Sequence, residues 1–299
     1  MSTHAHVPQE HIPVMLRECL EYLNVRPDGV FLDATTGLGG HAGAIARGLT
    51  SGLLLACDRD AESLEIAKAN TADCAARIRY RQSSFSQLEG VLAAEGVTQV
   101  NGLLADLGVS RYQLTRGERG FSLMSDGPLD MRMQRDAMSK QQRTAADIVN
   151  FESEHELAHL IFQWGEERRS RKIARAIVRA RPIQTTGQLA KLIEAAVPRT
   201  GKLHPATQTF MALRIAVNDE MEELDALLAS IPRLVGAGGR AVILTFMSLE
   251  DRKVKQSFQA MAKAGGAKLL NRHVIRPSEE ETRDNPPSRS AKLRAIELV

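Results

Sequence analysis

Short apolar runs alternate with helical patterns over the first third of the chain. The runs are VFLDAT, LLLACD, IRYRQ and NGLLAD, at residues 30–35, 53–58, 78–82 and 101–106. Between them, residues 40–49 and 60–72 space their apolar residues as helices do. Alternation of apolar strands with helices is typical of an α/β protein with a parallel, doubly wound sheet.

The alternation stops near Gly108 and resumes in the last quarter of the chain. Further strands are predicted at residues 240–246, 268–275 and 291–299. The last two have no long helix between them, so we expect them to pair as antiparallel strands.

The middle of the chain reads as helical throughout. Apolar residues recur there in three stripes at helical spacing. The stripes are Leu157, Leu160, Ile161 and Trp164; Ile173, Ile177 and Ala180; and Phe210, Leu213, Val217, Met221, Leu224 and Leu228, the third on one helix that leads back to the sheet. We therefore predict a sheet domain formed by residues 1–112 and 216–299, interrupted by a helical insertion at 113–215.

Composition indicates a globular protein of a reducing compartment. The chain has 299 residues, 43% of them hydrophobic, and a formal net charge of +3. Its three cysteines form no C-x-x-C pair, which argues against a disulfide framework or a structural zinc site. We find no secretory signal and no apolar run long enough for a membrane, so a cytoplasmic protein is expected.

A glycine-rich turn follows the first predicted strand, in the sequence DATTGLGGHA at residues 33–42. Gly37 and Gly39 permit a tight turn and close approach of a ligand, and Asp58, at the end of the next strand, suits the hydroxyls of a ribose. Asp33 would repel a pyrophosphate but suits the ammonium of a methionine moiety, which favours S-adenosylmethionine over NAD. A nicotinamide oxidoreductase remains an alternative, since Gly37-x-Gly39-x-x-Ala42 also fits the loose dinucleotide pattern.

Asp106 ends the fourth predicted strand. Ligands of open α/β sheets bind at the carboxyl ends of the strands, so Asp106 is expected to contact an adenine amine or the substrate. The alternative is a loop carboxylate in water.

The sequence His155-Glu156-x-x-His159 resembles the helical motif of zinc hydrolases. The apolar stripe beginning at Leu157 places both histidines on the opposite, solvent-facing side of the helix. Phe162 and Gly165 stand where the extended motif needs a glycine and a third histidine. We therefore interpret the pattern as surface sequence and predict no metal site.

Basic residues crowd one segment of the predicted insertion. They are Arg168, Arg169, Arg171, Lys172, Arg175, Arg179 and Arg181, with no acidic residue until Glu194. Such a stripe suits the phosphates of a nucleic acid, and the alternative is a solvated face partly neutralised by Glu166 and Glu167.

Motifs along nearly the whole chain resemble one family, the bacterial small-subunit rRNA cytosine-N4 methyltransferases, also called RsmH or MraW. The matching segments are HIPVML (11–16), DATTGLGGHA (33–42), DRD (58–60), DLGVS-x-x-QL (106–114), RGFSLMSDGPLDMRM (119–133), GEE (165–167), HPAT-x-TF (204–210), ALRIAVNDE (212–220), SLEDRKVK (248–255) and SRSAKLR (288–294). The resemblance implies a Rossmann-like, S-adenosylmethionine-dependent enzyme that methylates the N4 amine of a cytidine in 16S rRNA, in the decoding region of the small ribosomal subunit. The helical insertion would then bind RNA.

The resemblance also implies roles for particular residues. The cofactor contacts would be Gly39, Gly40, His41, Asp58, Phe85, Asp106 and Gln113. Asp106 would also serve catalysis as an acceptor for the N–H groups of the target amine. Four residues in the motif segments are expected to contact the base or sugar of the substrate, namely Arg119, Arg132, His204 and Arg289.

The chain departs from the family where Met247 replaces a histidine and Pro287 replaces a basic residue. These departures keep open a second hypothesis, an RNA-binding ribosome assembly factor with a vestigial cofactor pocket. The sequence is compatible with a homodimer but does not decide the oligomeric state.

Overall fold

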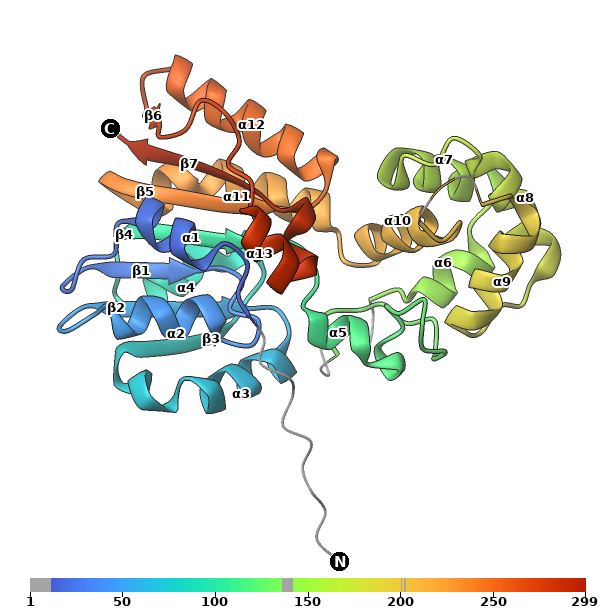
Figure 1. Ribbon diagram of the computed structural model, residues 1–299, viewed down its shortest axis with the longest axis horizontal. Helices are drawn as coiled ribbons and strands as arrows, with labels where there is room; N and C mark the ends of the chain where they lie inside the picture. Colours follow the sequence, from blue (N-terminus) through green and yellow to red (C-terminus); the bar gives the residue numbers. More distant parts are fainter. Residues whose placement is uncertain (1–11, 136–141, 200, 202) are drawn as a thin grey trace, which may run out of the picture. The chain divides into compact units, whose positions relative to one another are not determined.

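Seven strands form one sheet within the residues that the structure describes, which are 12–135, 142–199, 201 and 203–299 (Figure 1). The strands of this computed structural model are β1 (Val30–Asp33), β2 (Leu53–Asp58), β3 (Ile78–Gln82), β4 (Val100–Asp106), β5 (Val235–Thr245), β6 (Ala267–Leu269) and β7 (Lys292–Leu298). Their order in the sheet is β3-β2-β1-β4-β5-β7-β6. Strands β1 to β5 are parallel, and β7 pairs antiparallel with both β5 and β6, as expected for the closing strands.

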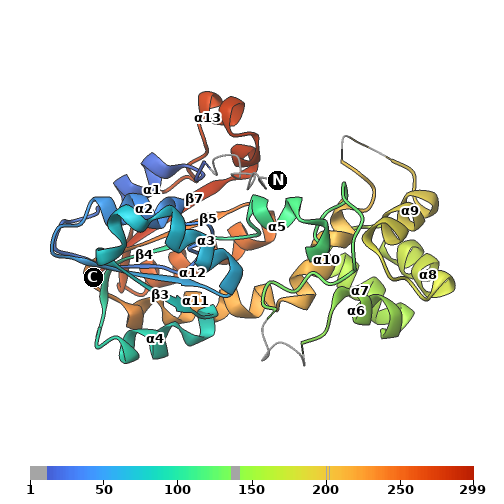
Figure 2. The same ribbon diagram turned by 90° about the horizontal axis from the view of Figure 1, so that it is seen from below.

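Helices cover both faces of this sheet (Figures 1 and 2). They are α1 (Leu16–Leu23), α2 (Gly40–Arg47), α3 (Ala61–Asn70), α4 (Leu88–Ala94), α11 (Glu220–Leu234) and α12 (Ser248–Lys263). Shorter elements near them are η1 (Ala72–Arg77), η2 (Phe85–Gln87), α13 (Glu279–Asp284) and η5 (Pro286–Ser290). The predicted α/β class with a doubly wound sheet is confirmed.

Two apolar layers sandwich the sheet because its central strands β1, β2 and β4 carry nearly continuous apolar runs. Phe31 and Leu104 face the core formed with α1 and α2, whereas Leu32 and Leu103 face the core formed with α4, α11 and α12. Successive strand residues point to opposite faces, so a strand buried on both sides needs a continuous apolar run.

The chain divides into two units, the sheet unit of residues 1–108 and 223–299 and a helical unit of residues 109–222. The predicted insertion, residues 113–215, lies within the helical unit. Its elements are α5 (Arg111–Thr115), η3 (Gly117–Arg119), α6 (Ala145–Phe151), α7 (Glu154–Gly165), α8 (Ser170–Ala180), α9 (Thr186–Ala196) and α10 (Thr207–Val217).

The helical unit has a core of its own, and its helices begin at clear capping signals. Leu157, Ile161, Ile173 and Ile177 from the predicted stripes are buried in this core. Capping boxes start α6, α7 and α9, formed by Thr144 with Asp147, Ser153 with Glu156, and Thr185 with Gln188.

The third predicted stripe lies on two helices rather than one, which corrects the expectation from periodicity. Helix α10 ends at Val217, and α11 begins at Glu220. Asp219, between them, has φ +49°, a left-handed conformation that cannot continue an α-helix.

The predicted strand at 268–275 was too long, because β6 ends at Leu269. Beyond it the side chain of Asn271 takes the place of the strand ladder: its Oδ1 accepts from the main-chain N–H of Ala295, and its Nδ2 donates to the carbonyl of Leu293. A local polar side chain thus interrupts the strand.

Candidate active site

Three acidic residues mark one edge of the sheet, each at the carboxyl end of a parallel strand. Asp33 ends β1, Asp58 ends β2 and Asp106 ends β4. Strand β1 pairs with β2 on one side and β4 on the other, so the chain reverses its direction of winding between β1 and β4. Such a switch point is where open α/β sheets bind ligands.

The glycine turn connects β1 to α2 and is tied to the end of β2. The main-chain N–H of Gly37 donates to Oδ2 of Asp58 at 2.7 Å. Gly37 and Gly39 have φ of +51° and +89°, conformations that favour glycine. A Cβ on Gly39 would lie 3.1 Å from the methyl group of Thr71, whereas a Cβ on Gly37 would meet only a carbonyl oxygen at 3.9 Å. Gly39 therefore serves packing on α3, while the side of the turn at Gly37 is open.

Asp58 holds both the turn and the start of the next helix. Its Oδ1 accepts from the N–H of Asp60 at 2.9 Å, in addition to the bond from Gly37. Burial raises the pKa of Asp58 to about 6, although these two hydrogen bonds act to lower it. Each carboxylate oxygen has a second lone pair, so the two bonds leave acceptor capacity for ribose hydroxyls.

Asp33 lies beneath the turn and is fully buried. Its Oδ1 accepts from the N–H of Thr35 at 3.0 Å, and its Oδ2 has no hydrogen-bond partner. Burial raises the pKa of this carboxyl to about 7. Protein atoms cover the carboxyl, so direct contact with a ligand ammonium, which remains a prediction, requires the turn to shift.

Asp106 lies at the end of the neighbouring strand with its side chain 20% exposed. Its main-chain N–H donates to the hydroxyl of Thr35 at 2.6 Å, while its Oδ1 is buried without a partner. Burial, followed by the charges of Asp33 and Glu250, raises the pKa of Asp106 to about 8. The group is thus poised to change protonation near neutral pH.

The Gly39-Gly40-His41 segment begins α2 beside this carboxyl. His41 is 5% exposed, with its Nδ1 3.8 Å from Oδ2 of Asp106. A Cβ on Gly40 would lie 3.1 Å from Pro13, so the α2 terminus packs closely on the segment before α1.

Buried polar atoms without partners gather at this edge of the sheet. They are Oδ2 of Asp33, Oγ1 of Thr36 and Oδ1 of Asp106. Such atoms are costly when unpaired and are uncommon in native proteins, so a group of them is suited to binding a ligand. Because two are carboxylate oxygens, the site fits a nucleoside that carries positive charge.

Two other predicted cofactor contacts lie on short helices outside the glycine turn. Phe85 is the first residue of η2, after β3, and packs partly buried against the core of the sheet unit. Gln113 belongs to the helical unit, where its Oε1 accepts from the N–H of Ser110 and completes the capping box of α5.

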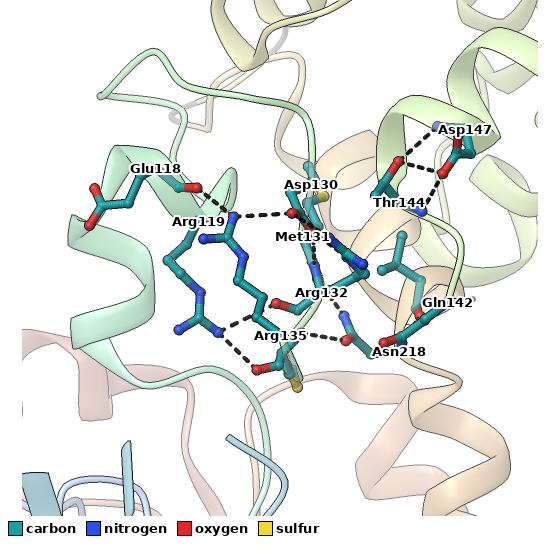
Figure 3. Close-up of polar contacts among 12 residues, drawn as sticks. Glu118, Arg119, Asp130, Met131, Arg132, Arg135, Gln142, Thr144, Asp147 and Asn218 are labelled. Atoms are coloured by element: carbon teal, nitrogen blue, oxygen red, sulfur yellow. Dashed lines mark hydrogen bonds and ion pairs between the residues drawn. The ribbon is translucent and has the colours of Figure 1, made fainter. Parts of the chain in front are cut away.

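Arg119 and Arg132, predicted to bind substrate, take part in a polar network within the helical unit (Figure 3). Arg119 is buried and donates from Nη2 to the carbonyl of Met133 at 2.9 Å. Arg132 forms a two-pronged ion pair with Asp130, at 2.8 and 3.0 Å. Burial raises the pKa of Asp130, but the hydrogen bonds from Arg132 and the charge of Arg135 outweigh it and leave the pKa lowered.

Asn218 completes this network from the end of α10 (Figure 3). Its Oδ1 accepts from the N–H of Met133, and its Nδ2 donates to the carbonyl of Met131, both at 2.8 Å. Met131 has φ +61°, so these bonds hold the segment in an unfavourable conformation for a side chain of this size. The polar side chains of the motif segment 119–133 therefore serve largely to hold the main chain of that same segment in place.

The remaining predicted substrate residues are more accessible. Nδ1 of His204 accepts from the N–H of Ala206 at 3.1 Å, which leaves Nε2 as the donor of the neutral ring. Arg289 is exposed on η5 in the sheet unit. Substrate contact by all four residues remains a prediction.

The zinc-like motif lies on the surface of α7. His155 and His159 are exposed while Leu157 and Ile161 are buried, which confirms the predicted helix orientation. Glu156 accepts from the N–H of Ser153 as part of the capping box. Over the described ranges of the chain, no group of three or more His, Cys, Asp or Glu residues is placed to hold a metal ion.

None of the helices described has the length and apolar character to cross a membrane.

Three further residues of the site were missed by the sequence reasoning. Thr35 and Thr36 lie inside the quoted turn motif, but nothing in the pattern distinguished their hydroxyls from ordinary turn residues. Glu250 lies on α12, about 140 residues beyond Asp106 in sequence, and it is buried. Its Oε2 accepts from the main-chain N–H groups of Phe246 and Met247. This glutamate belongs to the motif segment SLEDRKVK, but the motif gave no sign that it lies near Asp106.

A doubly wound sheet with a glycine turn and acids at its switch point defines a Rossmann-like, nucleotide-binding protein. The family described as the MraW methylase family matches residues 8–299, and the chain belongs to this family.

Similar proteins cover nearly the whole chain. A protein from Solibacter usitatus named ribosomal RNA small subunit methyltransferase H is 57% identical over 288 residues, covering 96% of this chain and 99% of its own. A protein of the same name from Acidobacterium capsulatum is 46% identical over 299 residues, covering 97% and 98%. A solved structure described as an rRNA methylase of Clostridium thermocellum aligns with 96% of this chain and 99% of its own, with a TM-score of 0.46 at 10% identity.

Proposed function

We propose that this chain transfers a methyl group from S-adenosylmethionine to the N4 amine of a cytidine in 16S rRNA. Membership of the MraW methylase family over residues 8–299 is the observation that supports this most directly. Relatives named ribosomal RNA small subunit methyltransferase H, one of them 57% identical, support the choice of substrate. The decoding region of the small subunit is the proposed location of the target, and the cytoplasm, where ribosomes are, is the proposed compartment.

The acidic edge of the sheet suits this cofactor. S-adenosylmethionine carries a sulfonium and an ammonium, and Asp33, Asp58 and Asp106 would be stabilised in their ionised forms by a cation. Asp58 would accept from the ribose hydroxyls, as its spare lone pairs allow. We assign the other contacts to Gly37 and to Gly39, Gly40, His41, Phe85 and Gln113.

The cofactor supplies a methyl group already activated by the positively charged sulfur, so the protein mainly needs to align the acceptor. The cytosine amine is a weak nucleophile because its lone pair is delocalised into the ring. The Asp106 carboxylate, by accepting an N–H of this amine, would draw electron density back to nitrogen. Backbone carbonyls of the loop 106–110 would be further acceptors. The target base has to be unpaired, since a stacked base cannot reach such a site.

The helical unit offers a surface for the RNA backbone. On α8, Ile173 and Ile177 face the core, and Arg171, Lys172 and Arg179 are exposed on the other side. Two other arginines of the segment are used internally: Arg169 pairs with Glu167, and Arg181 donates to the carbonyl of Val149. Arg175 pairs with Glu154 at the surface, and Arg168 is exposed just before the helix. We propose that the exposed cations bind phosphates.

Mass spectrometry of rRNA nucleosides tests the proposed function. A strain that lacks the gene should lose N4-methylated cytidine, and the modification should return with the wild-type gene but not with Asp106→Ala. Purified small subunits from the deletion strain should accept a labelled methyl group in vitro. Unchanged nucleosides in the deletion strain would exclude this activity.

Two alternatives have separate outcomes in these experiments. An assembly factor with a vestigial pocket would bind the subunits but transfer no label. A nicotinamide oxidoreductase would bind NADH and not S-adenosylhomocysteine in isothermal titration. Family membership favours methyl transfer over both.

A further inference from the structure

Thr35 is the first residue of the glycine turn to leave the sheet, and it contacts both neighbouring acids. Its main-chain N–H donates to Oδ1 of Asp33 at 3.0 Å. Its hydroxyl oxygen accepts from the main-chain N–H of Asp106 at 2.6 Å.

The directions of these bonds fit together. A hydroxyl has one proton and two acceptor lone pairs. The amide of Asp106 uses one of these lone pairs, while the main-chain N–H of Thr35 is directed to the carboxylate of Asp33. One residue therefore connects a buried carboxyl on β1 to the backbone of β4.

The Thr35 side chain replaces a missing part of the strand ladder. The β1–β4 register ends with Asp33 opposite Leu104, and the next bond runs from Ala34 N–H to the Leu104 carbonyl. Beyond that point β1 turns away, so its main chain is not available to Asp106. On the opposite side, Asp106 stays in register with Leu244 of β5. The hydroxyl of Thr35 thus holds Asp106 on the β1 side.

We propose that Thr35 is a positioning residue for methyl transfer, because its main-chain N–H binds the buried Asp33 carboxyl while its hydroxyl binds the main chain of Asp106. The proposal rests on the proposed function, in which Asp106 contacts the acceptor amine. It gives Asp33 a role that needs no direct contact with the ligand. Small displacements of a catalytic group have large effects on the rate of an aligned transfer.

The test compares Thr35→Val, which keeps the shape and removes the hydroxyl, with Thr35→Ser, which keeps the hydroxyl. Thr50→Val is the matched control, since the hydroxyl of Thr50 is exposed and donates to the carbonyl of Pro27. Three quantities are measured: kcat on small subunits at saturating S-adenosylmethionine, Kd for S-adenosylhomocysteine, and hydrogen exchange of the Asp106 amide by NMR.

Thr35→Val should lower kcat about tenfold to a hundredfold while the Kd changes by less than about threefold. Its Asp106 amide should exchange faster, and Thr35→Ser should restore both the rate and the protection. Thr50→Val should match the wild type in all three quantities.

The proposal is overturned if Thr35→Val keeps its kcat, if Thr35→Ser is equally impaired, or if the Asp106 amide exchanges unchanged. A parallel loss of kcat and of S-adenosylhomocysteine binding would also overturn it, because Thr35 would then act through the cofactor. Failure of the proposed function is a different result, in which the wild type itself transfers no methyl group. The amide exchange still decides the role of Thr35 in that case.

Discussion

Nδ1 of His41 lies 3.8 Å from Oδ2 of Asp106, and Nε2 of the same ring lies 3.0 Å from the carbonyl oxygen of Val14. A carbonyl can only accept, so Nε2 carries a proton and the state of Nδ1 depends on Asp106. A protonated Asp106 could donate to Nδ1 of a neutral ring, whereas an ionised Asp106 would favour an imidazolium. A change in the charge of either group therefore acts on the other at this end of the sheet.

Replacing Asp106 with alanine should abolish turnover and leave the protein folded. We expect kcat to fall by at least about a hundredfold, the usual effect of removing a group that handles a proton in the reaction. Unfolding by urea should require at least as much denaturant as in the wild type, because a buried acid with a partnerless oxygen is lost. The control is Asp225→Ala, a substitution on α11 at a surface ion pair with Lys253 of α12. Near-normal turnover by Asp106→Ala would remove this residue from the mechanism.

The preference for S-adenosylmethionine over S-adenosylhomocysteine should increase with pH. The pKa values of Asp33 and Asp106 are raised to about 7 and about 8, chiefly by burial, so both acids are partly protonated at neutral pH. A bound sulfonium favours the ionised forms, so its binding releases protons until the pH exceeds the pKa of each acid. The ratio of the two Kd values should thus shift toward S-adenosylmethionine between about pH 6 and 8.

Isothermal titration of both ligands across this pH range measures that ratio. The two ligands share the amine and the nucleoside, so their own titration cancels from the comparison. Asp106→Asn should flatten the pH dependence of the ratio. A ratio that is constant from pH 6 to 8 in the wild type would show that these acids do not sense the sulfonium.

Charge reversal on α8 should weaken RNA binding and reduce its dependence on salt. The triple variant Arg171→Glu, Lys172→Glu and Arg179→Glu removes three exposed cations. Each lost phosphate contact should lower the slope of log K against log salt by about 0.7–0.9. Filter binding to 16S rRNA at several salt concentrations gives the slope.

The matched control for this variant has to carry the same net charge. Arg26→Glu, Lys263→Glu and Lys268→Glu reverse three exposed cations of the sheet unit. If both triple variants lose affinity equally, the effect reflects overall charge and the α8 surface has no special role.

Gly39→Ala should destabilise the protein through packing. The new Cβ would lie 3.1 Å from the Thr71 methyl group at a residue with φ +89°, and we expect the free energy of unfolding to fall by about 1–3 kcal/mol. Gly37→Ala should cost less, because its Cβ would meet only a carbonyl oxygen at 3.9 Å. Gly90→Ala, on α4 with nothing within 4 Å of its Cβ, should be stabilising by roughly 0.5–1 kcal/mol. Urea unfolding of the three variants checks this order, and equal losses at Gly39 and Gly37 would contradict it.

The sequence by itself determined the sheet, because strands buried on both faces need continuous apolar runs and few other structures tolerate them. Strands β2 and β3 have the predicted bounds, and the glycine turn and Asp58 were predicted from their order along the chain. Periodicity also placed His155 and His159 on the solvent side of α7.

Only the tertiary structure decided which polar side chains meet. Asp33 and Asp106 are about 70 residues apart in sequence, and Thr35 joins them through its main-chain N–H and its hydroxyl because β1 and β4 are neighbours in the sheet. Asn271 ended β6 early, and Asn218 fixed the segment containing Met131, through hydrogen bonds to distant backbone. A side chain's hydrogen-bond partner depends on three-dimensional proximity, which periodicity along one element does not encode.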